Sequence, residues 1–386
     1  MSDAPPSRAL ARRTTTELQL DAATQRHVFS QLMADRAEVV LPPLPTGRHM
    51  FGPATLGTEE PPGQTWDSAS FRSVNAWLVV FTDVLVHSDA GIIAAGGAVV
   101  ADTLQQTSPE RHGYAITEDG IALPEREVEH LVGTWISLLG GNYENYYHWT
   151  LDGLGRFAPL PAEVMAIYGN MLVPPLAPGY QQDSFAMSGL GEGRRLHSVA
   201  RDQTFHIERL VVPWSITGYH TPHPSIAPFF ARFRPAAAED LPRRIYIDRR
   251  AGDRAPNAHR CLVNDDEVVA GLARLGFVPV RLETLPFAAQ AALFAGADFI
   301  VAPHGAGLAN LVYARPGTML VELHMDGWVN WCFRNLAATL GITYDAVLGR
   351  ELNVERPPGV TTRFWSTSVM HLLAAIQSAL DRPRVE

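Results

Sequence analysis

The sequence predicts an α/β protein of two domains, of which at least one is built on a parallel, doubly wound sheet. The chain has 386 residues, which is more than one ordinary hydrophobic core takes up. Between residues 243 and 350, apolar runs of strand length alternate with segments whose apolar residues recur at helical spacing. Such short strand–helix repeats favour a parallel sheet with helices on both faces.

The most informative motif lies in residues 298–322, which read DFIVAPHGAGLANLVYARPGTMLVE. This stretch predicts a buried strand, a Gly-rich turn, a short helix and a second strand. The turn consists of His304, Gly305, Ala306 and Gly307. Glycines let a phosphate approach the backbone, and the amide groups at a helix N-terminus point towards it. The motif therefore indicates an anion site, although a tight turn whose glycines serve packing alone has the same pattern.

Two polar side chains of this stretch suit a nucleotide site. His304 could add a hydrogen bond or a positive charge to a bound phosphate. Glu322 ends the second strand, where open α/β sheets bind their ligands, and could accept hydrogen bonds from ribose hydroxyls. The motif as a whole thus predicts one wall of a ligand site.

Arginines follow another expected strand, RRIYIDRR. Arg249 and Arg250 end this strand, and Arg260 lies in the segment that comes next. Because the carboxyl ends of parallel strands meet at one edge of a sheet, we expect these arginines on the same side as HGAG. Guanidinium groups bind phosphates through paired hydrogen bonds, so a diphosphate site is favoured over solvated surface arginines.

A second candidate site lies between residues 130 and 158. The apolar run HLVGTWISLLG predicts a strand, and the helical segment after it carries His148 and Asp152 four residues apart, on one helix face. Either group could act as a general base, or the two could simply satisfy each other beside packed aromatic rings. Asn145, Tyr147 and Trp149 are candidates for contacts with a sugar acceptor. A zinc pair is disfavoured because no further ligands stand at useful spacing.

Composition excludes several classes of protein. The net charge of −9 argues against a nucleic-acid binder. Two cysteines, Cys261 and Cys332, imply no disulfide framework and fit a reducing compartment. The chain contains no apolar segment of transmembrane length and no signal-peptide core, so a cytoplasmic location is expected.

The outer parts of the chain are less informative. Residues 1–70 predict an extension and linker, with one helix over residues 18–36. Residues 73–103 predict a small antiparallel meander, and the Pro-rich residues 213–243 predict an interdomain linker. An apolar helix is expected over residues 367–380, packing back on the N-terminal domain.

Four blocks now stand in order: NYYHWTLDGLGRF, YIDRRAGDRAPNAHRCLVNDDEVVAGLARLGF, ADFIVAPHGAGLANLVYARPGTMLVEL and NWCFRNLAATLG. Together they resemble glycosyltransferase family 61, also described as capsular polysaccharide biosynthesis proteins. The resemblance implies a GT-B fold, in which two Rossmann-like doubly wound domains face a central cleft. It also implies an inverting mechanism, a nucleotide-sugar donor and no obligatory metal.

The resemblance assigns expected roles by position. His148 and Asp152 fall in the block that faces the cleft. The donor would be bound by Arg249, Arg250, Arg260, His304, Gly305, Ala306, Gly307, Asn310 and Glu322. The expected divisions are an extension over 1–70, an acceptor domain over 71–235, a donor domain over 236–350 and a C-terminal helical segment over 351–386.

We therefore expect a cytoplasmic, metal-independent glycosyltransferase without a cofactor, acting on a carbohydrate acceptor in bacterial surface polysaccharide or capsule synthesis. Peripheral membrane association and a homodimer stay open. The alternative is a nucleotide-sugar-binding protein that has lost catalysis. A doubly wound NAD-dependent oxidoreductase is disfavoured, because no GxGxxG follows the first strand of either half.

Overall fold

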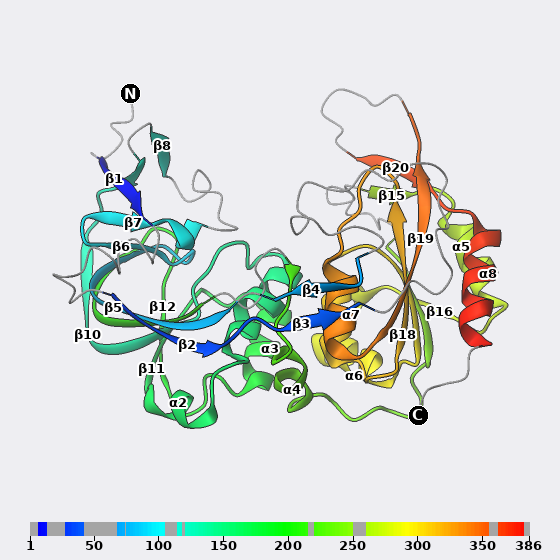
Figure 1. Ribbon diagram of the computed structural model, residues 1–386, viewed down its shortest axis with the longest axis horizontal. Helices are drawn as coiled ribbons and strands as arrows, with labels where there is room; N and C mark the ends of the chain where they lie inside the picture. Colours follow the sequence, from blue (N-terminus) through cyan, green and yellow to red (C-terminus); the bar gives the residue numbers. More distant parts are fainter. Residues whose placement is uncertain are drawn as a thin grey trace. The chain divides into compact units, whose positions relative to one another are not determined.

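The computed structural model describes residues 7–13, 28–41, 68–73, 75–104, 114–117, 120–214, 220–249, 260–354 and 362–381. The chain forms two compact units (Figure 1). The first unit comprises Met1–Arg36 and Val74–Ile216, and the second comprises Ala37–Ser73 and Thr217–Glu386. Each unit has its own sheet and its own buried core.

The first unit contains a parallel set of strands with a Rossmann-like order. They stand side by side as β12-β11-β10-β13, which is the order 3-2-1-4 in sequence. The chain order reverses between β10 and β13, and this reversal defines a topological switch point. The bounds are β10 Val128–Ser137, β11 Asn170–Val173, β12 Arg195–Ser198 and β13 Thr204–Trp214.

Beyond β13 the same sheet continues with strands that pair mostly antiparallel, the parallel pair β1 and β7 excepted. The expected meander is confirmed, because β5, β6 and β7 pair antiparallel in succession and β5 joins them to β13. The first unit is therefore a mixed sheet rather than a wholly parallel one. The further strands are β5 Ala76–His87, β6 Ile92–Ala95, β7 Ala98–Val100, β1 Ser7–Arg13, β8 Ala115–Thr117 and β9 Gly120–Pro124.

The helix expected over residues 18–36 is wrong in its described part. Val28–Ala34 forms strand β2, which pairs antiparallel with β5. The long strand β5 offers a free edge on that side, and pairing with this edge outweighs a loose helical periodicity. Residues 14–27 lie outside the described part of the chain.

The second unit confirms the parallel sheet. Its strands stand in the order β15-β20-β19-β18-β17-β14-β16, and all neighbours from β16 to β19 run parallel. In sequence order these five are 2-1-3-4-5, so the switch point lies between β14 and β17. The bounds are β14 Arg244–Ile247, β15 Arg260–Leu262, β16 Val278–Val280, β17 Phe299–Pro303, β18 Met319–Met325, β19 Thr343–Glu351 and β20 Arg363–Ser366.

Helices cover both faces of this sheet. Figure 1 shows α5 and α8 on one face and α6 and α7 on the other. The C-terminal helix was expected to pack on the N-terminal domain, but its buried face lies in the core of the second unit, where α8 contacts α5. The bounds are α5 Asp265–Ala273, α6 Phe287–Gly296, α7 Cys332–Leu340 and α8 Val369–Leu380.

The expected linker is partly folded into the second unit. Within it, α4 (Ile226–Ala231) buries Phe230 against Tyr313, with ring centroids 6.0 Å apart. Part of the N-terminal extension also belongs to this unit, as the short pair β3 (Glu38–Val40) and β4 (Ser70–Arg72). The second unit is therefore built from two stretches of the chain, residues 37–73 and the chain from Thr217 onwards.

Candidate functional site

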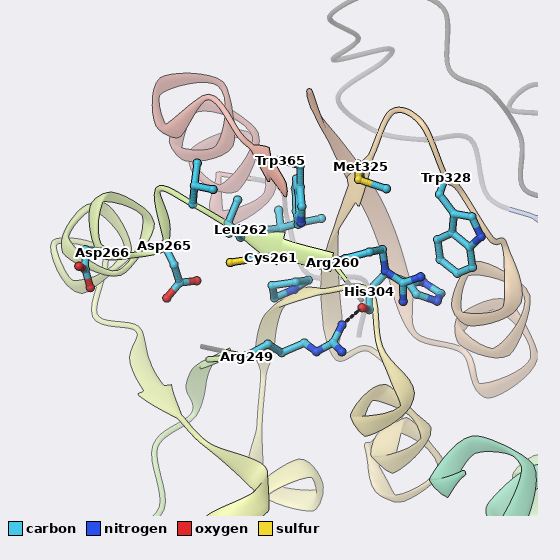
Figure 2. A pocket seen from close by; sticks show the side chains of 13 residues that line it. Arg249, Arg260, Cys261, Leu262, Asp265, Asp266, His304, Met325, Trp328 and Trp365 are labelled. Carbon is cyan, nitrogen blue, oxygen red and sulfur yellow. Dashed lines mark hydrogen bonds between the residues drawn. The ribbon is translucent and has the colours of Figure 1, made fainter. Parts of the chain in front are cut away.

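A cavity of about 470 Å³ lies in the second unit, at the carboxyl ends of its parallel strands (Figure 2). Its walls come from the carboxyl ends of β17 and β18, from the segments that follow β14, β17 and β18, and from β15, the start of α5 and β20. This is the switch-point edge at which open α/β sheets bind ligands. The lining residues are Arg249, Arg260, Cys261, Leu262, Val263, Asp265, Asp266, Pro303, His304, Leu323, Met325, Trp328 and Trp365.

Arg249 lies at the switch point itself. It follows β14, and its guanidinium donates a hydrogen bond to the backbone oxygen of His304, which follows β17 (Figure 2). The guanidinium packs directly on Gly305, where an added Cβ would lie 2.5 Å from the Arg249 Cζ. The first glycine of HGAG is thus required by the close approach of this arginine.

Arg260 supplies a second positive charge to the same part of the cavity. It projects from β15, and its Cζ lies 3.9 Å from the centroid of the Trp328 ring, a cation–π contact. Burial and, next, the charge of Arg249 lower the pKa of Arg260 to about 10, so the group stays charged at neutral pH. Figure 2 shows both arginines and His304 on one side of the cavity and the carboxylates of Asp265 and Asp266 on the other. The arginine side suits an anionic ligand.

His304 joins the cavity wall to a buried polar cluster. Its Nδ1 lies 2.6 Å from Oε1 of Glu322, which is fully buried. The Tyr344 hydroxyl donates to Oε2 of Glu322 at 2.7 Å, and His324 Nε2 lies 3.2 Å from the same oxygen. Glu322 is not among the residues that line the cavity, so its side chain supports His304 from behind.

The remaining residues of the HGAG region hold the turn together. Ala306 begins a 3₁₀ helix, Ala306–Tyr313, in place of an α-helix. Asn310 is fully buried and donates to Gly307 O at 3.0 Å and to Gln290 Oε1 at 3.2 Å. None of Gly305, Ala306, Gly307 and Asn310 lines the cavity. Arg250, the remaining sequence-based candidate of this site, lies outside the described residues.

The structure brings His148 and Asp152 together in the first unit. Both lie on a π-helical turn, His148–Gly153, in the segment after β10. His148 Nδ1 is 2.6 Å from Asp152 Oδ2. Their side chains keep 18% and 10% of their surface exposed, so the pair is accessible at its edge. This arrangement suits proton transfer, with the carboxylate orienting the imidazole.

The three candidate acceptor contacts differ in exposure. Trp149 is fully buried and donates from Nε1 to Ser184 Oγ at 2.8 Å. Tyr147 is also buried, whereas Asn145 is exposed and accepts a hydrogen bond from the Tyr147 backbone at 2.9 Å. Asn145 is therefore the one of these three with a side chain at the surface.

A metal could be considered at one cluster of the described residues. His304, Glu322 and His324 offer ligand-type atoms within 4.8 Å of one another. The hydrogen bonds among these side chains and Tyr344 already account for their arrangement, and a metal would have to replace the short contact between His304 and Glu322.

Sequence reasoning missed several lining residues. Trp328 follows β18 just as His304 follows β17, so its place after a strand end was a usable signal. Asp265 begins α5 and gave no sequence signal for the site, although it is buried and lines the cavity. Trp365 carried no local signal, because β20 reaches the cavity only through pairing with β15 and β19.

Fold and site together define an α/β protein with a cavity at the switch point of a parallel sheet, one side of which carries two arginines. Residues 146–321 match the model of the family described as Glycosyltransferase 61. This match confirms the resemblance to glycosyltransferase family 61 and supports a glycosyltransferase activity. The matched stretch begins just before His148 and ends just before Glu322. No curated protein matches the chain.

In the described part of the chain, none of the helices has the length and apolar character needed to cross a membrane.

Proposed function

We propose that this glycosyltransferase takes its sugar from a nucleotide-sugar donor, whose diphosphate binds in the cavity of the second unit. The observation that carries the proposal is the pair of guanidinium groups, Arg249 and Arg260, at the switch point of the parallel sheet. In that position they would stabilise the negative charge that grows on the leaving nucleoside diphosphate. Fixed cationic groups can supply this stabilisation in place of a metal ion, so we propose a metal-independent reaction.

The acceptor hydroxyl would lose its proton to the His148–Asp152 pair. It would then attack the anomeric carbon from the side opposite the leaving diphosphate, which inverts the configuration at that carbon. The short contact between His148 and Asp152 supports this role, because the carboxylate fixes the ring and stabilises its protonated form. A carbohydrate acceptor and a role in bacterial surface polysaccharide synthesis are proposed from the family resemblance alone. A cytoplasmic location is proposed because the free thiols of Cys261 and Cys332 fit a reducing compartment.

The donor site is tested by calorimetric titration with UDP, GDP and CDP. Wild type should bind at least one of them, and Arg249→Ala or Arg260→Ala should weaken that binding by tenfold or more, since each loses a charge-assisted hydrogen bond. The matched control is Arg274→Ala, which removes an exposed arginine just after α5. Equal affinities in all four proteins would contradict the proposed site.

Two variants in the first unit separate transfer from donor binding. Asp152→Asn and His148→Ala should lower transfer or donor hydrolysis by about 10²-fold or more, and both should keep wild-type affinity for the nucleoside diphosphate. Full turnover in both variants would refute the assignment of the base. Donor binding with no turnover of any tested nucleotide sugar would instead favour a binding protein without catalysis.

A further inference from the structure

His304 stands in front of a polar cluster that ordinary packing does not require. Glu322 and His324 lie two residues apart on β18 and therefore share one face of the sheet. Tyr344 on the adjacent strand β19 reaches Glu322 from the side. All three are almost completely buried. A buried carboxylate is destabilised unless its oxygens receive hydrogen bonds, so the cluster must keep Glu322 supplied with donors.

The hydrogen bonds within the cluster indicate which ring nitrogen of His304 carries a hydrogen. Burial alone would raise the pKa of Glu322, but the two neighbouring histidines lower it below its ordinary value, so the group is a carboxylate that only accepts hydrogen bonds. Nδ1 of His304, 2.6 Å from Oε1, must therefore carry a hydrogen. The Tyr344 hydroxyl donates its hydrogen to Oε2 of Glu322. His324 Nε2 lies 3.1 Å from the Tyr344 oxygen and can donate a hydrogen bond to it.

The other nitrogen of His304 is then left for the cavity. Burial, only partly offset by Glu322, lowers the pKa of His304 to about 4, and the charge of Arg260 acts in the same direction. The ring is therefore neutral at neutral pH, with its single hydrogen on Nδ1. Since His304 lines the cavity and Nδ1 faces Glu322, Nε2 is the nitrogen left to present a lone pair to the ligand side.

The lone pair on His304 Nε2 can only accept a hydrogen bond, so it favours a ligand group that donates one. Phosphate oxygens at neutral pH accept hydrogen bonds, so they gain nothing from an unprotonated Nε2. A sugar hydroxyl can donate. Resting on the proposed donor site, we propose that His304 Nε2 accepts a hydrogen bond from a hydroxyl of the bound nucleotide sugar, and that Glu322, Tyr344 and His324 are positioning residues that fix its tautomer. In this proposal His304 binds a hydroxyl of the ligand, while Arg249 and Arg260 bind the diphosphate.

The tautomer is tested first without any ligand. In protein labelled with ¹⁵N-histidine, the ring signals lost in His304→Asn should show a protonated Nδ1 and an unprotonated Nε2 at pH 7. Tyr344→Phe removes one donor to Glu322 and should shift these signals. Tyr313→Phe is the matched control, because the buried Tyr313 hydroxyl has no hydrogen-bond partner among the described residues, and it should leave them unchanged. A charged ring, or a hydrogen on Nε2, overturns the inference.

The hydroxyl is tested with three kinds of probe. His304→Asn should weaken binding of the preferred nucleoside diphosphate, or of its nucleotide sugar, about fivefold to tenfold, and should leave pyrophosphate binding unchanged. If wild type and His304→Asn bind the 2′-deoxy or the 3′-deoxy nucleotide with equal affinity, the hydroxyl that His304 contacts belongs to the ribose. A loss confined to the nucleotide sugar identifies a hydroxyl of the transferred sugar.

Tyr344→Phe should reproduce part of the loss seen in His304→Asn, and Glu322→Gln should do so more strongly if it folds. An equal loss for pyrophosphate would show that His304 binds phosphate, and no loss with any probe would also overturn the hydroxyl contact. If wild type binds no nucleoside diphosphate, the proposed donor site fails, and the ring spectrum still decides the state of His304 by itself.

Discussion

Arg249 follows β14 and Gly305 follows β17, yet the two residues pack against each other. Arg249 and His304, which share a hydrogen bond, are 55 residues apart in the sequence. The hydrogen bond from Arg249 to the His304 carbonyl fixes the guanidinium at the edge of the sheet. Gly305 leaves room for it because a Cβ at this position would lie 2.5 Å from the Arg249 Cζ. The backbone φ of Gly305 is 173°, an extended value that any residue could adopt. Space for Arg249, and not backbone conformation, explains the glycine at this position.

Gly305→Ala should therefore displace Arg249 and weaken nucleoside diphosphate binding by about tenfold, in the range expected for loss of a charge-assisted hydrogen bond. Calorimetric titration measures the effect. The control is Gly296→Ala in α6, where the new Cβ would make an ordinary contact 3.8 Å from Ala237 Cβ. Unchanged affinity in Gly305→Ala would show that Arg249 does not need its present position.

At the scale of elements, α8 depends on both its cap and its buried face. Ser368 precedes the helix, and its hydroxyl accepts a hydrogen bond from the His371 backbone N–H at 3.3 Å. Leu372, Ala375 and Ile376 bury the apolar face in the core of the second unit. The helix therefore closes one side of the sheet that carries the cavity.

Ser368→Ala should lower the free energy of unfolding by about 1 kcal/mol, since it leaves a backbone donor at the helix start without its cap. Chemical denaturation measures this change. Met370→Ala alters the same helix at a side chain that is 73% exposed, and it should change stability by less than about 0.5 kcal/mol. Equal effects of the two substitutions would contradict the role of the cap.

At the scale of the whole molecule, buried titratable groups in both units make stability depend on pH in one direction. In the first unit, burial and, next, Arg126 lower the pKa of His87 to about 4. In the second unit, burial lowers the pKa of His304 to about 4 as well. Between the ordinary histidine pKa and this value, the unfolded chain binds protons that the folded chain does not. The lowered pKa of Glu322 acts in the same direction at more acidic pH.

The free energy of unfolding should therefore be highest above about pH 6.5 and should fall as the pH decreases towards 4. Each histidine contributes a slope of up to about 1.4 kcal/mol per pH unit. Denaturation at pH 7.5, 6 and 5 measures the slope. His87→Gln removes one of the two groups and should flatten the dependence, and parallel profiles for this variant and wild type would contradict the assignment.

The sequence determined the local elements of the second unit and the residue types of its site. Apolar runs of strand length located β17 and β18, because their pattern agrees with the final packing. The same pattern placed Arg249 and His304 after two strands of one parallel sheet. The family blocks could be recognised for the same reason, since they are local in sequence.

Tertiary structure decided what each residue contacts. Only the pairing of β2 with β5 made a strand of a segment with helical periodicity, and only the core of the second unit decided where α8 packs. Glu322 was expected at the end of its strand, but β18 continues to Met325, and strand register buries Glu322 behind His304, where it can orient the ring while standing outside the cavity wall. Burial, register and hydrogen-bond partners depend on distant segments, and for that reason local sequence could name these residues without assigning their contacts.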